Sequence, residues 1–408
     1  MTFQLRGATL VDGSGRDPQP TTTVVLEGDR IAAVEAGSPN GSARGDVIDV
    51  DGLTLLPGLI DAHTHFGIVN FGEDRAPAAV TAARIFRNCE LALEAGFTTV
   101  RDVGGIDGGV AQAVELGLIA GPRIFPSGPI LCQTGGHGDD SPPFAAAHHP
   151  HGHGLPGLTQ PGFPCDGPDQ VRLAARDVLR RGATQLKVCV SGGVVSFTDR
   201  LEDAQFSVEE LKAAVAEADA RDTYVTAHAH NVKGIRNGLA AGVECFEHGT
   251  FLDESTAQAM AEAGAYLVPT FAVVRIFAEK AKEWGVPDEI VPRMAGIEDA
   301  MARSLGLARD AGVVIGSGSD ILGPEQDRRG LEIAIRAELG DPMEAIVAAT
   351  AVNARILRRA DDIGIVETGK RADVIAVDGN PLTDAKLFDD PSRVVLVIKD
   401  GRVVKDLR

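Results

Sequence analysis

The sequence PGLIDAHTHFG, at residues 57–67, points to both the architecture and the chemistry of this chain. Its apolar start is typical of a buried strand, and it ends in two histidines, His63 and His65. Residues i and i+2 of a strand point to the same face, so both imidazoles would converge at the end of one strand. A lone His-x-His pair is a weak sign of a metal site, but its position at the end of a predicted strand makes it a much stronger one.

Short β-branched runs recur beyond this stretch, and alanine-rich amphipathic segments lie between several of them. Counting the first, eight strands are expected, at residues 55–60, 98–102, 123–127, 185–190, 224–227, 245–247, 266–269 and 313–316. Eight strands with helical connections predict a closed (β/α)₈ TIM barrel, an α/β fold. An open doubly wound sheet is the structural alternative, but no GxGxxG follows the first strand.

The two ends of the chain resemble each other. Both contain short strand-turn-strand patterns, at residues 2–10, 22–35, 372–378 and 393–405. Asp400-Gly401 is a hairpin turn signal. We therefore expect residues 1–56 and 352–408 to pair into one small β-sandwich domain, and residues 57–351 to form the barrel.

Residues 132–168 interrupt the alternation of strands and helices. They are rich in Gly, Pro and His and have no strong period, which is typical of a lid or binding loop when the rest of the domain is compact. The HHPHGH stretch within them, with His148, His149, His151 and His153, resembles a metal-binding tract. We interpret it as a surface loop with adventitious metal affinity.

Composition excludes several classes of function. The chain has 408 residues, with 39 basic and 58 acidic side chains and a formal charge of −19, which argues against nonspecific nucleic-acid binding and against docking on anionic lipid. No apolar run is long enough to span a membrane, and the start does not resemble a signal peptide. The 5 cysteines are scattered and form no CxxC pair, so we expect reduced thiols and a cytoplasmic location.

Four further candidate ligands each lie at the end of a predicted strand: Lys187 in TQLKVCV, His228 in YVTAHAH, His248 in ECFEHG and Asp320 after VVIGSGS. Singly, each has an ordinary explanation, because a core His can bond a backbone carbonyl and an Asp after a strand often caps a helix. Burying the ammonium of a lysine, however, costs several kcal/mol unless a partner is near. Together the candidates fall at strands one, four, five, six and eight, which end at the same rim of a barrel.

These residues resemble the ligand pattern of the amidohydrolase superfamily. The chain is most similar to the imidazolonepropionase-like branch, which contains metal-dependent Xaa-Pro and other Xaa-amino-acid dipeptidases. Matching stretches run along essentially the whole chain: PGLIDAHTH, FTTVRDVGG at 97–105, QTGGHGD at 133–139, LKVCVSGGVVS at 186–196, AHAHN at 227–231, EHGTFLD at 247–253, AYLVPTF at 265–271 and DGNPL at 378–382.

The resemblance implies a binuclear site for two divalent metal ions, usually Zn²⁺. In that pattern one ion is held by His63, His65 and Asp320, the second by His228 and His248, and carboxylated Lys187 bridges both. A carbamate would explain the buried lysine, because it replaces a costly cation with an anion between two dications. Nitrogen and oxygen donors of this kind suit Zn²⁺.

The resemblance also implies roles in the reaction. A hydroxide that bridges the metals would attack the scissile carbonyl, and Asp320 would carry the water proton to the leaving nitrogen. His137, in the GGHG loop after strand three, resembles a residue that contacts the substrate carbonyl, although it could also be an ordinary polar loop residue. Related dipeptidases often carry Tyr where this chain has His230, which we assign to carbonyl contact or to support behind the ligands.

The leading hypothesis is hydrolysis of the amide bond of a dipeptide or an N-acyl amino acid. The alternative on the same site is another C–N bond, in an imidazolone-type cyclic amide, a urea or a carbamate. A structural protein that has lost its ligands is disfavoured, because all six ligand positions are filled. The expected partners are a small-molecule amide substrate and further copies of the chain in a homo-oligomer, with no nucleic acid and no membrane.

Overall fold

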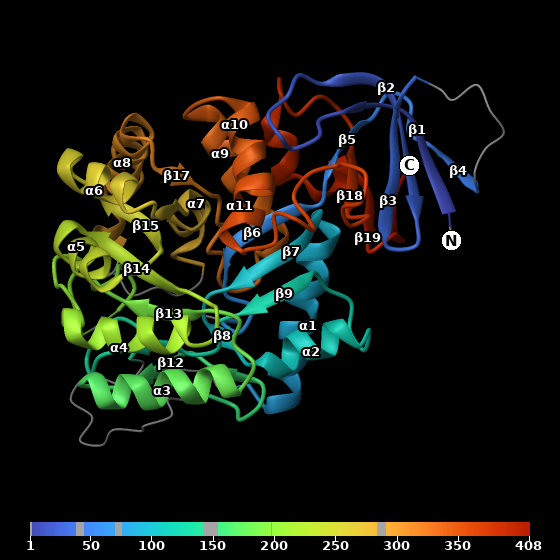
Figure 1. Ribbon diagram of the computed structural model, residues 1–408. Helices are drawn as coiled ribbons and strands as arrows, with labels where there is room; N and C mark the ends of the chain where they lie inside the picture. The colour runs from blue at the N-terminus through green and yellow to red at the C-terminus, as the bar shows by residue number, and fades with distance from the viewer. Residues whose placement is uncertain are drawn as a thin grey trace.

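The computed structural model describes residues 2–37, 45–69, 76–139, 141, 154–196, 198–283 and 291–408. In Figure 1 a strand-and-helix barrel lies beside a sheet that holds both ends of the chain. The predicted α/β fold class, a (β/α)₈ TIM barrel with a small β-sandwich domain formed by both chain ends, is confirmed. The histidines of the HHPHGH stretch lie outside the described residues.

The terminal sheet joins the first and last parts of the sequence. Its strand order is β20-β19-β18-β5-β1-β2-β3, and β4 pairs with β1. The two ends meet where β5 runs antiparallel to β18, with Thr54 opposite Val377 and Pro57 opposite Val374. The strands are β1 (Thr2–Leu10), β2 (Gln19–Glu27), β3 (Arg30–Ala36), β4 (Asp46–Asp49), β5 (Thr54–Pro57), β18 (Val374–Val377), β19 (Val394–Lys399) and β20 (Arg402–Asp406).

Within the part of the chain that the structure describes, eight strands form the barrel. They are β6 (Leu59–Thr64), β7 (Phe97–Asp102), β9 (Arg123–Pro126), β13 (Leu186–Cys189), β14 (Val225–Asn231), β15 (Cys245–Phe251), β16 (Tyr266–Val268) and β17 (Val314–Ile315). Closure of the barrel places β6 beside the segment after β17: the Ala62 amide donates to the Ser317 carbonyl at 3.0 Å. The Thr184 amide likewise donates to the Pro126 carbonyl at 2.8 Å, linking β9 to the start of β13.

The predicted first barrel strand, residues 55–60, was placed too early. Residues 54–57 form β5 of the terminal sheet, because their backbone groups pair with β18, and the barrel strand β6 begins at Leu59. Gly58, between the two strands, donates its amide to the Asp373 carbonyl at 2.9 Å. A continuous apolar run therefore serves two sheets in succession.

The division of the chain into domains at residues 56/57 and 351/352 stays a prediction.

Helices surround the barrel (Figure 1). They are α1 (Ala78–Glu94), α2 (Gly108–Glu115), α3 (Pro168–Arg180), α4 (Val208–Asp219), α5 (Val232–Ala241), α6 (Glu254–Glu262), α7 (Phe271–Lys280), α8 (Ile297–Ala311), α9 (Leu331–Glu338), α10 (Pro342–Val347) and α11 (Asn353–Ile356). Local sequence fixes several ends: Ser207 and Glu210 form a capping box at the start of α4, and Gly242 ends α5 with a φ of 95°. Apolar faces of α3 to α8 pack against the outer faces of β13–β17.

The described parts of residues 132–168 contain β-strands, which the sequence did not predict because this segment has no strong hydrophobic period. β10 (Ile130–Cys132) pairs with β12 (Gly162–Pro164), and β11 (Thr159–Gln160) pairs with β8 (Gly105–Ile106). The two ends of the segment are thereby attached to the barrel rim. Its role as a lid stays a prediction.

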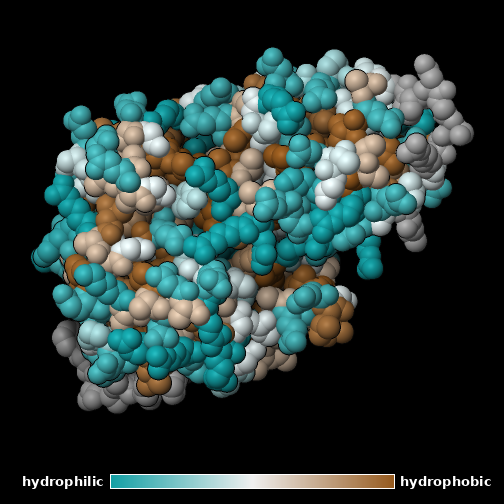
Figure 2. Space-filling model, viewed as in Figure 1, coloured by the Kyte–Doolittle hydropathy of each residue, from teal (hydrophilic) through white to brown (hydrophobic). Residues whose placement is uncertain are grey.

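Polar side chains cover most of the face seen in Figure 2, and apolar ones lie between them in small groups. Among the described residues, no helix is both long and apolar enough to cross a bilayer.

Arg123 links the barrel to the terminal sheet. It lies in β9 and donates to Asp373 at 2.8 Å and to Asp400 at 2.5 Å. Removing one partner of a buried ion pair costs about 3–5 kcal/mol. Because Arg123 is 21% exposed, we expect Arg123→Met to cost somewhat less, about 2 kcal/mol. The midpoint of urea-induced unfolding measures this loss.

The matched control is Arg200→Met. Arg200 also pairs with an aspartate, Asp203 at 3.0 Å, but its side chain is 77% exposed. We expect this variant to unfold at nearly the same urea concentration as the parent, because solvent screens an exposed ion pair. Equal midpoints for the two variants would contradict a stabilising role for the Arg123 link.

Candidate metal centre

Two groups of buried donors lie at the carboxyl ends of the barrel strands. In each group, every residue offers one ligand atom, and these atoms all lie within 4.8 Å of one another. The first ligand group is His63, His65 and Asp320, and the second ligand group is His228, His230 and His248. Five of the predicted ligand residues therefore come together as expected from their positions at the strand ends.

The first ligand group has the spacing of donors around a single ion. His63 Nε2 lies 3.2 Å from His65 Nε2, and Asp320 Oδ1 lies 3.4 Å and 3.3 Å from these two nitrogens. Tetrahedral ligands at about 2.0–2.1 Å from Zn²⁺ lie about 3.3 Å apart. The residues present therefore fit a zinc ion. Asp320 reaches this position with a φ of 53°, an uncommon backbone conformation for a residue with a side chain.

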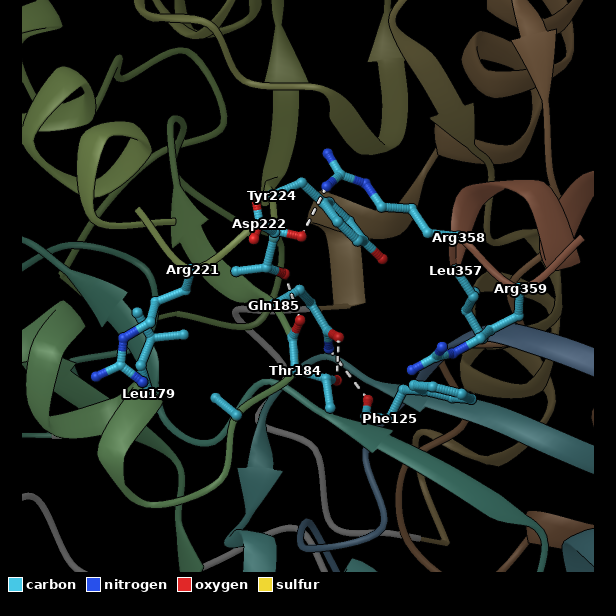
Figure 3. A pocket seen from close by; sticks show the side chains of 12 residues that line it. Phe125, Leu179, Thr184, Gln185, Arg221, Asp222, Tyr224, Leu357, Arg358 and Arg359 are labelled. Carbon is cyan, nitrogen blue, oxygen red and sulfur yellow. Dashed lines mark hydrogen bonds between the residues drawn. The ribbon is translucent and has the colours of Figure 1, made fainter. Parts of the chain in front are cut away.

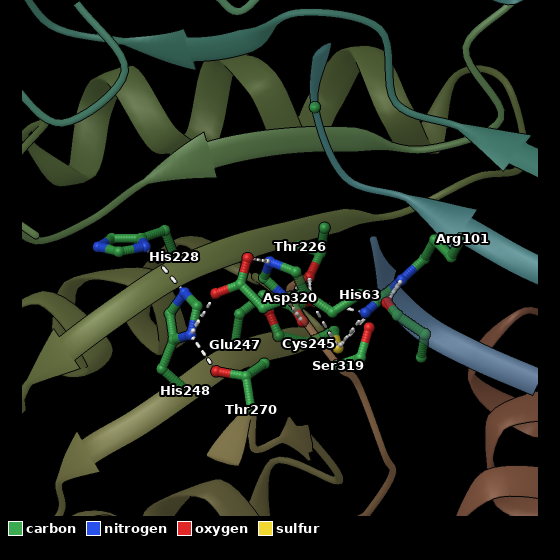
Figure 4. A network of polar contacts seen from close by, with 12 residues as sticks. His63, Arg101, Thr226, His228, Cys245, Glu247, His248, Thr270, Ser319 and Asp320 are labelled. Carbon is green, nitrogen blue, oxygen red and sulfur yellow. Dashed lines mark hydrogen bonds and ion pairs between the residues drawn. The ribbon is translucent and has the colours of Figure 1, made fainter. Parts of the chain in front are cut away.

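The second ligand group is equally compact. His228 Nδ1 lies 2.9 Å from His248 Nε2, and the ring of His230 stacks on that of His248 with centroids 4.8 Å apart. Figure 4 shows His228 and His248 pointing toward each other from neighbouring strands. His230 thus lies among the ligand candidates, and its assignment to support or carbonyl contact stays a prediction.

Each imidazole is oriented by a contact on its far nitrogen. His65 Nδ1 is 2.7 Å from the Gly104 carbonyl, His248 Nδ1 is 2.8 Å from Thr270 Oγ1, and His228 Nε2 is 3.1 Å from the Gly192 carbonyl. A proton on the far nitrogen leaves the lone pair of the other nitrogen facing the group. Such outer contacts are typical of metal-ligating histidines.

Burial keeps the rings of the second ligand group neutral. It lowers the pKa of both His228 and His248 well below the usual 6.5, and neighbouring histidines lower it further. For His63, burial alone would lower the pKa, but the Asp320 and Glu247 carboxylates outweigh it and raise the pKa. Metal binding needs the neutral imidazole, so the second ligand group is already in its binding form near neutral pH.

Lys187 lies on β13 with only 2% of its surface exposed. Burial lowers the pKa of its ammonium, and its charge in turn lowers the pKa of His63 and His248, so it lies near both ligand groups. Among the described residues, no carboxylate is within ion-pair distance of it. A buried amine without an ion pair thus faces a site made of donors.

His137 also belongs to the site. Its ring stacks on His228 with centroids 4.0 Å apart, and its Nδ1 lies 3.2 Å from Ser196 Oγ. Burial lowers its pKa to about 4. A Cβ on Gly193 would fall 2.2 Å from His137 Nδ1, so this close approach requires glycine at residue 193. The proposed contact of His137 with the substrate carbonyl stays a prediction.

Sequence reasoning missed the buried charges behind the ligands. Asp61 accepts hydrogen bonds from the amides of His63 and Ser319, both at 3.0 Å, and from Arg329 at 2.7 Å. It therefore ties β6 to the segment that carries Asp320. Glu247 lies 2.7 Å from His63 Nδ1. The sequence did carry a signal for both residues. Asp61 is a charged residue in an apolar strand two positions before His63, and Glu247 is a charged residue next to His248.

A pocket of about 430 Å³ lies at the opposite end of the barrel. Figure 3 shows Gln185 and Tyr224, which precede β13 and β14, together with Arg358 at its wall. Arg358 donates to both carboxylate oxygens of Glu244, at 2.8 and 2.9 Å, so its charge is neutralised. The amino ends of barrel strands serve stability rather than catalysis. The candidate site is therefore the donor cluster at the other rim.

Comparisons with known proteins agree with this geometry. The model of the family described as "Amidohydrolase family" matches residues 54–404. Ochratoxinase of Aspergillus niger is 36% identical over 415 aligned positions, covering 97% of this chain and 85% of that protein. A crystal structure of a prolidase complexed with N-methylphosphonate-L-proline superimposes with a TM-score of 0.94 at 38% identity, over 100% of both chains. A Xaa-Pro dipeptidase with methionine bound in the active site gives a TM-score of 0.90 at 32% identity, over 99% of this chain and 100% of that one.

Proposed function

Because this chain belongs to the amidohydrolase family, we propose that it is a binuclear metal-dependent hydrolase that cleaves the amide bond of a dipeptide or an N-acyl amino acid. The observation that supports this most is the pair of ligand groups at one rim, each with donor atoms within 4.8 Å of one another. A hydrolytic site on this family's barrel needs such a cluster of donors at the carboxyl ends of the strands.

In this proposal His63, His65 and Asp320 hold one ion, and His228 and His248 hold the second. Divalent ions at such a site lower the pKa of a bound water and polarise a carbonyl. Zn²⁺ is the proposed metal, because the donors are imidazole nitrogens and carboxylate oxygens.

Lys187 would complete the site as a carbamate. Its neutral amine is the form that adds to CO₂, releasing a proton, and burial favours this form because it lowers the pKa of the ammonium. The product is an anion with two oxygens, which removes the cost of a buried cation without an ion pair. Its place near both ligand groups supports a bridging role.

Asp320 is the proposed general base and acid. Its neighbours keep it ionised: burial alone would raise its pKa, but His63 and His65 together hold it well below the usual range. Oδ1 lies 3.3 Å from His65 Nε2 in the first ligand group, and Oδ2 lies 3.8 Å from Nδ1 of His248, a residue of the second ligand group. A carboxylate in this position can accept a proton from water and donate it to the leaving nitrogen.

His137 and His230 are proposed to contact the substrate carbonyl. Both are neutral near pH 7, because burial lowers their pKa values to about 4 and about 3. Ser196 contacts Nδ1 of His137, and Thr250 lies 2.7 Å from Nδ1 of His230. When the Thr250 hydroxyl donates to Nδ1 of His230, Nε2 of that ring carries the proton and can stabilise negative charge that develops on oxygen. The Ser196 hydroxyl instead donates to Asp199, so in His137 the proton is on Nδ1 and Nε2 faces substrate as an acceptor.

An amino-acid-derived amide is the proposed substrate class. The similar solved structures include a prolidase with an L-proline phosphonate and a Xaa-Pro dipeptidase with methionine. A homo-oligomeric state and a cytoplasmic location stay predictions.

The test is a screen of the zinc-loaded chain against dipeptides and N-acyl amino acids, with imidazolones, ureas and carbamates as controls. Turnover of the first two classes, lost on metal removal, supports the proposal. Turnover confined to the control classes would replace it with the alternative on the same site. No hydrolysis of any class by a chain that carries its metals would contradict it.

Removing the metal should lower activity and stability together. A ligand present at about 100 times its Kd stabilises the folded state by about 2.7 kcal/mol, so dialysis against dipicolinate should lower the melting temperature by several degrees. We expect activity to fall by about 100-fold or more, and added Zn²⁺ to restore both properties. Calorimetry and substrate turnover on the same sample check this. Full activity in a chain shown to be metal-free would contradict it.

A further inference from the structure

His63 has a different outer contact from the other candidate ligands. Its Nε2 faces the first ligand group, and its Nδ1 lies 2.7 Å from Glu247 Oε2. His65 and His228 bond backbone carbonyls, and His248 bonds a hydroxyl. Among the described candidate ligands, only His63 has a carboxylate within hydrogen-bond distance of its outer nitrogen, because Asp320 approaches Nδ1 of His248 no closer than 3.8 Å. A carboxylate fixes the tautomer of an imidazole and makes the ring a stronger donor to a metal.

Glu247 reaches this position because of the backbone at the next residue. Adjacent residues of a strand point to opposite faces, so Glu247 and His248 of β15 could not normally both face the barrel mouth. His248 has a φ of 67°, which breaks the alternation. Glu247 then contacts His63, while His248 joins the second ligand group (Figure 4). One strained residue lets a single strand supply both a ligand and the carboxylate behind another ligand.

The second oxygen of Glu247 is also fully engaged. Arg101 Nη2 donates to Glu247 Oε1 at 2.6 Å, and the Thr226 hydroxyl donates to the same oxygen. Both charged side chains are 0% exposed. Arg101 is itself fixed, because its Nε donates to the Ala62 carbonyl at 2.6 Å, beside His63. The contacts thus form a chain from Arg101 through Glu247 to His63.

We propose that Glu247, held as an anion by Arg101, is a positioning residue that sets the affinity of the first ligand group for its metal ion. It acts through the orientation and donor strength of His63 and touches no substrate. The second ligand group, whose outer hydrogen bonds go to a carbonyl and two hydroxyls, is independent of it. This inference rests on the proposed metal site.

The test compares metal affinities rather than activity alone. Metal-free parent and Glu247→Gln are titrated with Zn²⁺ against a chromophoric chelator, and their Co²⁺ forms are compared by visible absorption. The amide keeps the shape of the carboxylate but not its charge. We expect one of the two binding steps to weaken by about 10–100-fold, the range for lost outer contacts, and the other to change little. The Co²⁺ absorption band of the weakened site should also shift.

Two further variants separate this role from general damage. Glu210→Gln makes the same chemical change at a glutamate that caps α4 and accepts from the Ser207 amide at 2.6 Å, and it should leave both binding steps unchanged. If Glu247→Gln fails to fold because Arg101 is left unpaired, Arg101→Met/Glu247→Gln removes both charges, and it should still show the weakened step. Unchanged metal affinities and Co²⁺ spectra in a folded Glu247 variant would overturn this inference and leave the proposed function intact. A parent chain that binds no zinc would overturn the proposed function and this inference with it.

Discussion

Asp320→Asn should lower kcat/KM by about 10³-fold or more while the chain stays folded. The substitution removes the negative charge from the first ligand group, and an amide cannot accept the water proton and pass it on. Asp320 has no buried ion pair to arginine or lysine among the described residues, and its side chain is 14% exposed. We therefore expect the fold to tolerate the loss of its charge. Steady-state kinetics of the zinc-loaded variant, with circular dichroism to check folding, measure the effect.

Asp107→Asn is the matched control for this prediction. Asp107 is a buried aspartate whose carboxylate binds Arg181 at 2.6 Å, away from the ligand groups. Loss of this carboxylate should reduce the stability of the fold and leave kcat within a few-fold of the parent value. An Asp320→Asn enzyme with the turnover of the parent would show that the reaction does not use this carboxylate.

Lys187→Ala should lose metal as well as activity. If the lysine is a bridging carbamate, the variant lacks a donor shared by both ligand groups, and we expect turnover to fall by about 10³-fold with fewer metal ions retained per chain. Acetate or propionate should restore part of the activity, because a small carboxylate can enter the space that the side chain leaves. Metal content by mass spectrometry and a carboxylate titration of activity test this.

The stability of the metal-free chain gives this variant a second readout. A buried amine without an ion pair does not stabilise the fold. We therefore expect the melting temperature of metal-free Lys187→Ala to fall below that of the metal-free parent only by the amount that the lost aliphatic contacts of the lysine account for. Lys212→Ala, on α4, is a control that keeps activity. Retention of two tightly bound ions by Lys187→Ala would exclude the bridge.

The clustering of the candidate ligand residues could be predicted because their sequence signals are local. His63 and His65 share a face through the two-residue period of a strand, and each other candidate was assigned to the end of its own predicted strand. Once the strands form a barrel, their carboxyl ends meet at one rim, so residues distant in sequence come together. The compact groups around His63 and around His248 agree with that rule.

The supporting charges could not be predicted in the same way. Glu247 contacts His63 across 184 residues and Arg101 across 146 residues, and no spacing rule links them. The position of Glu247 also depends on the positive φ of His248, which has no mark in the sequence. The boundary at Gly58 was missed for a related reason: one apolar run serves two sheets, and only their pairing separates β5 from β6.

Titration of the metal-free chain with Zn²⁺ tests most directly whether side chains from five strands bind two cations at one rim of the barrel. Isothermal calorimetry should show two equivalents bound per chain, with Kd values well below micromolar, and hydrolysis should appear as the sites fill. Saturation at less than one equivalent, in a chain whose fold is intact, would contradict the claim.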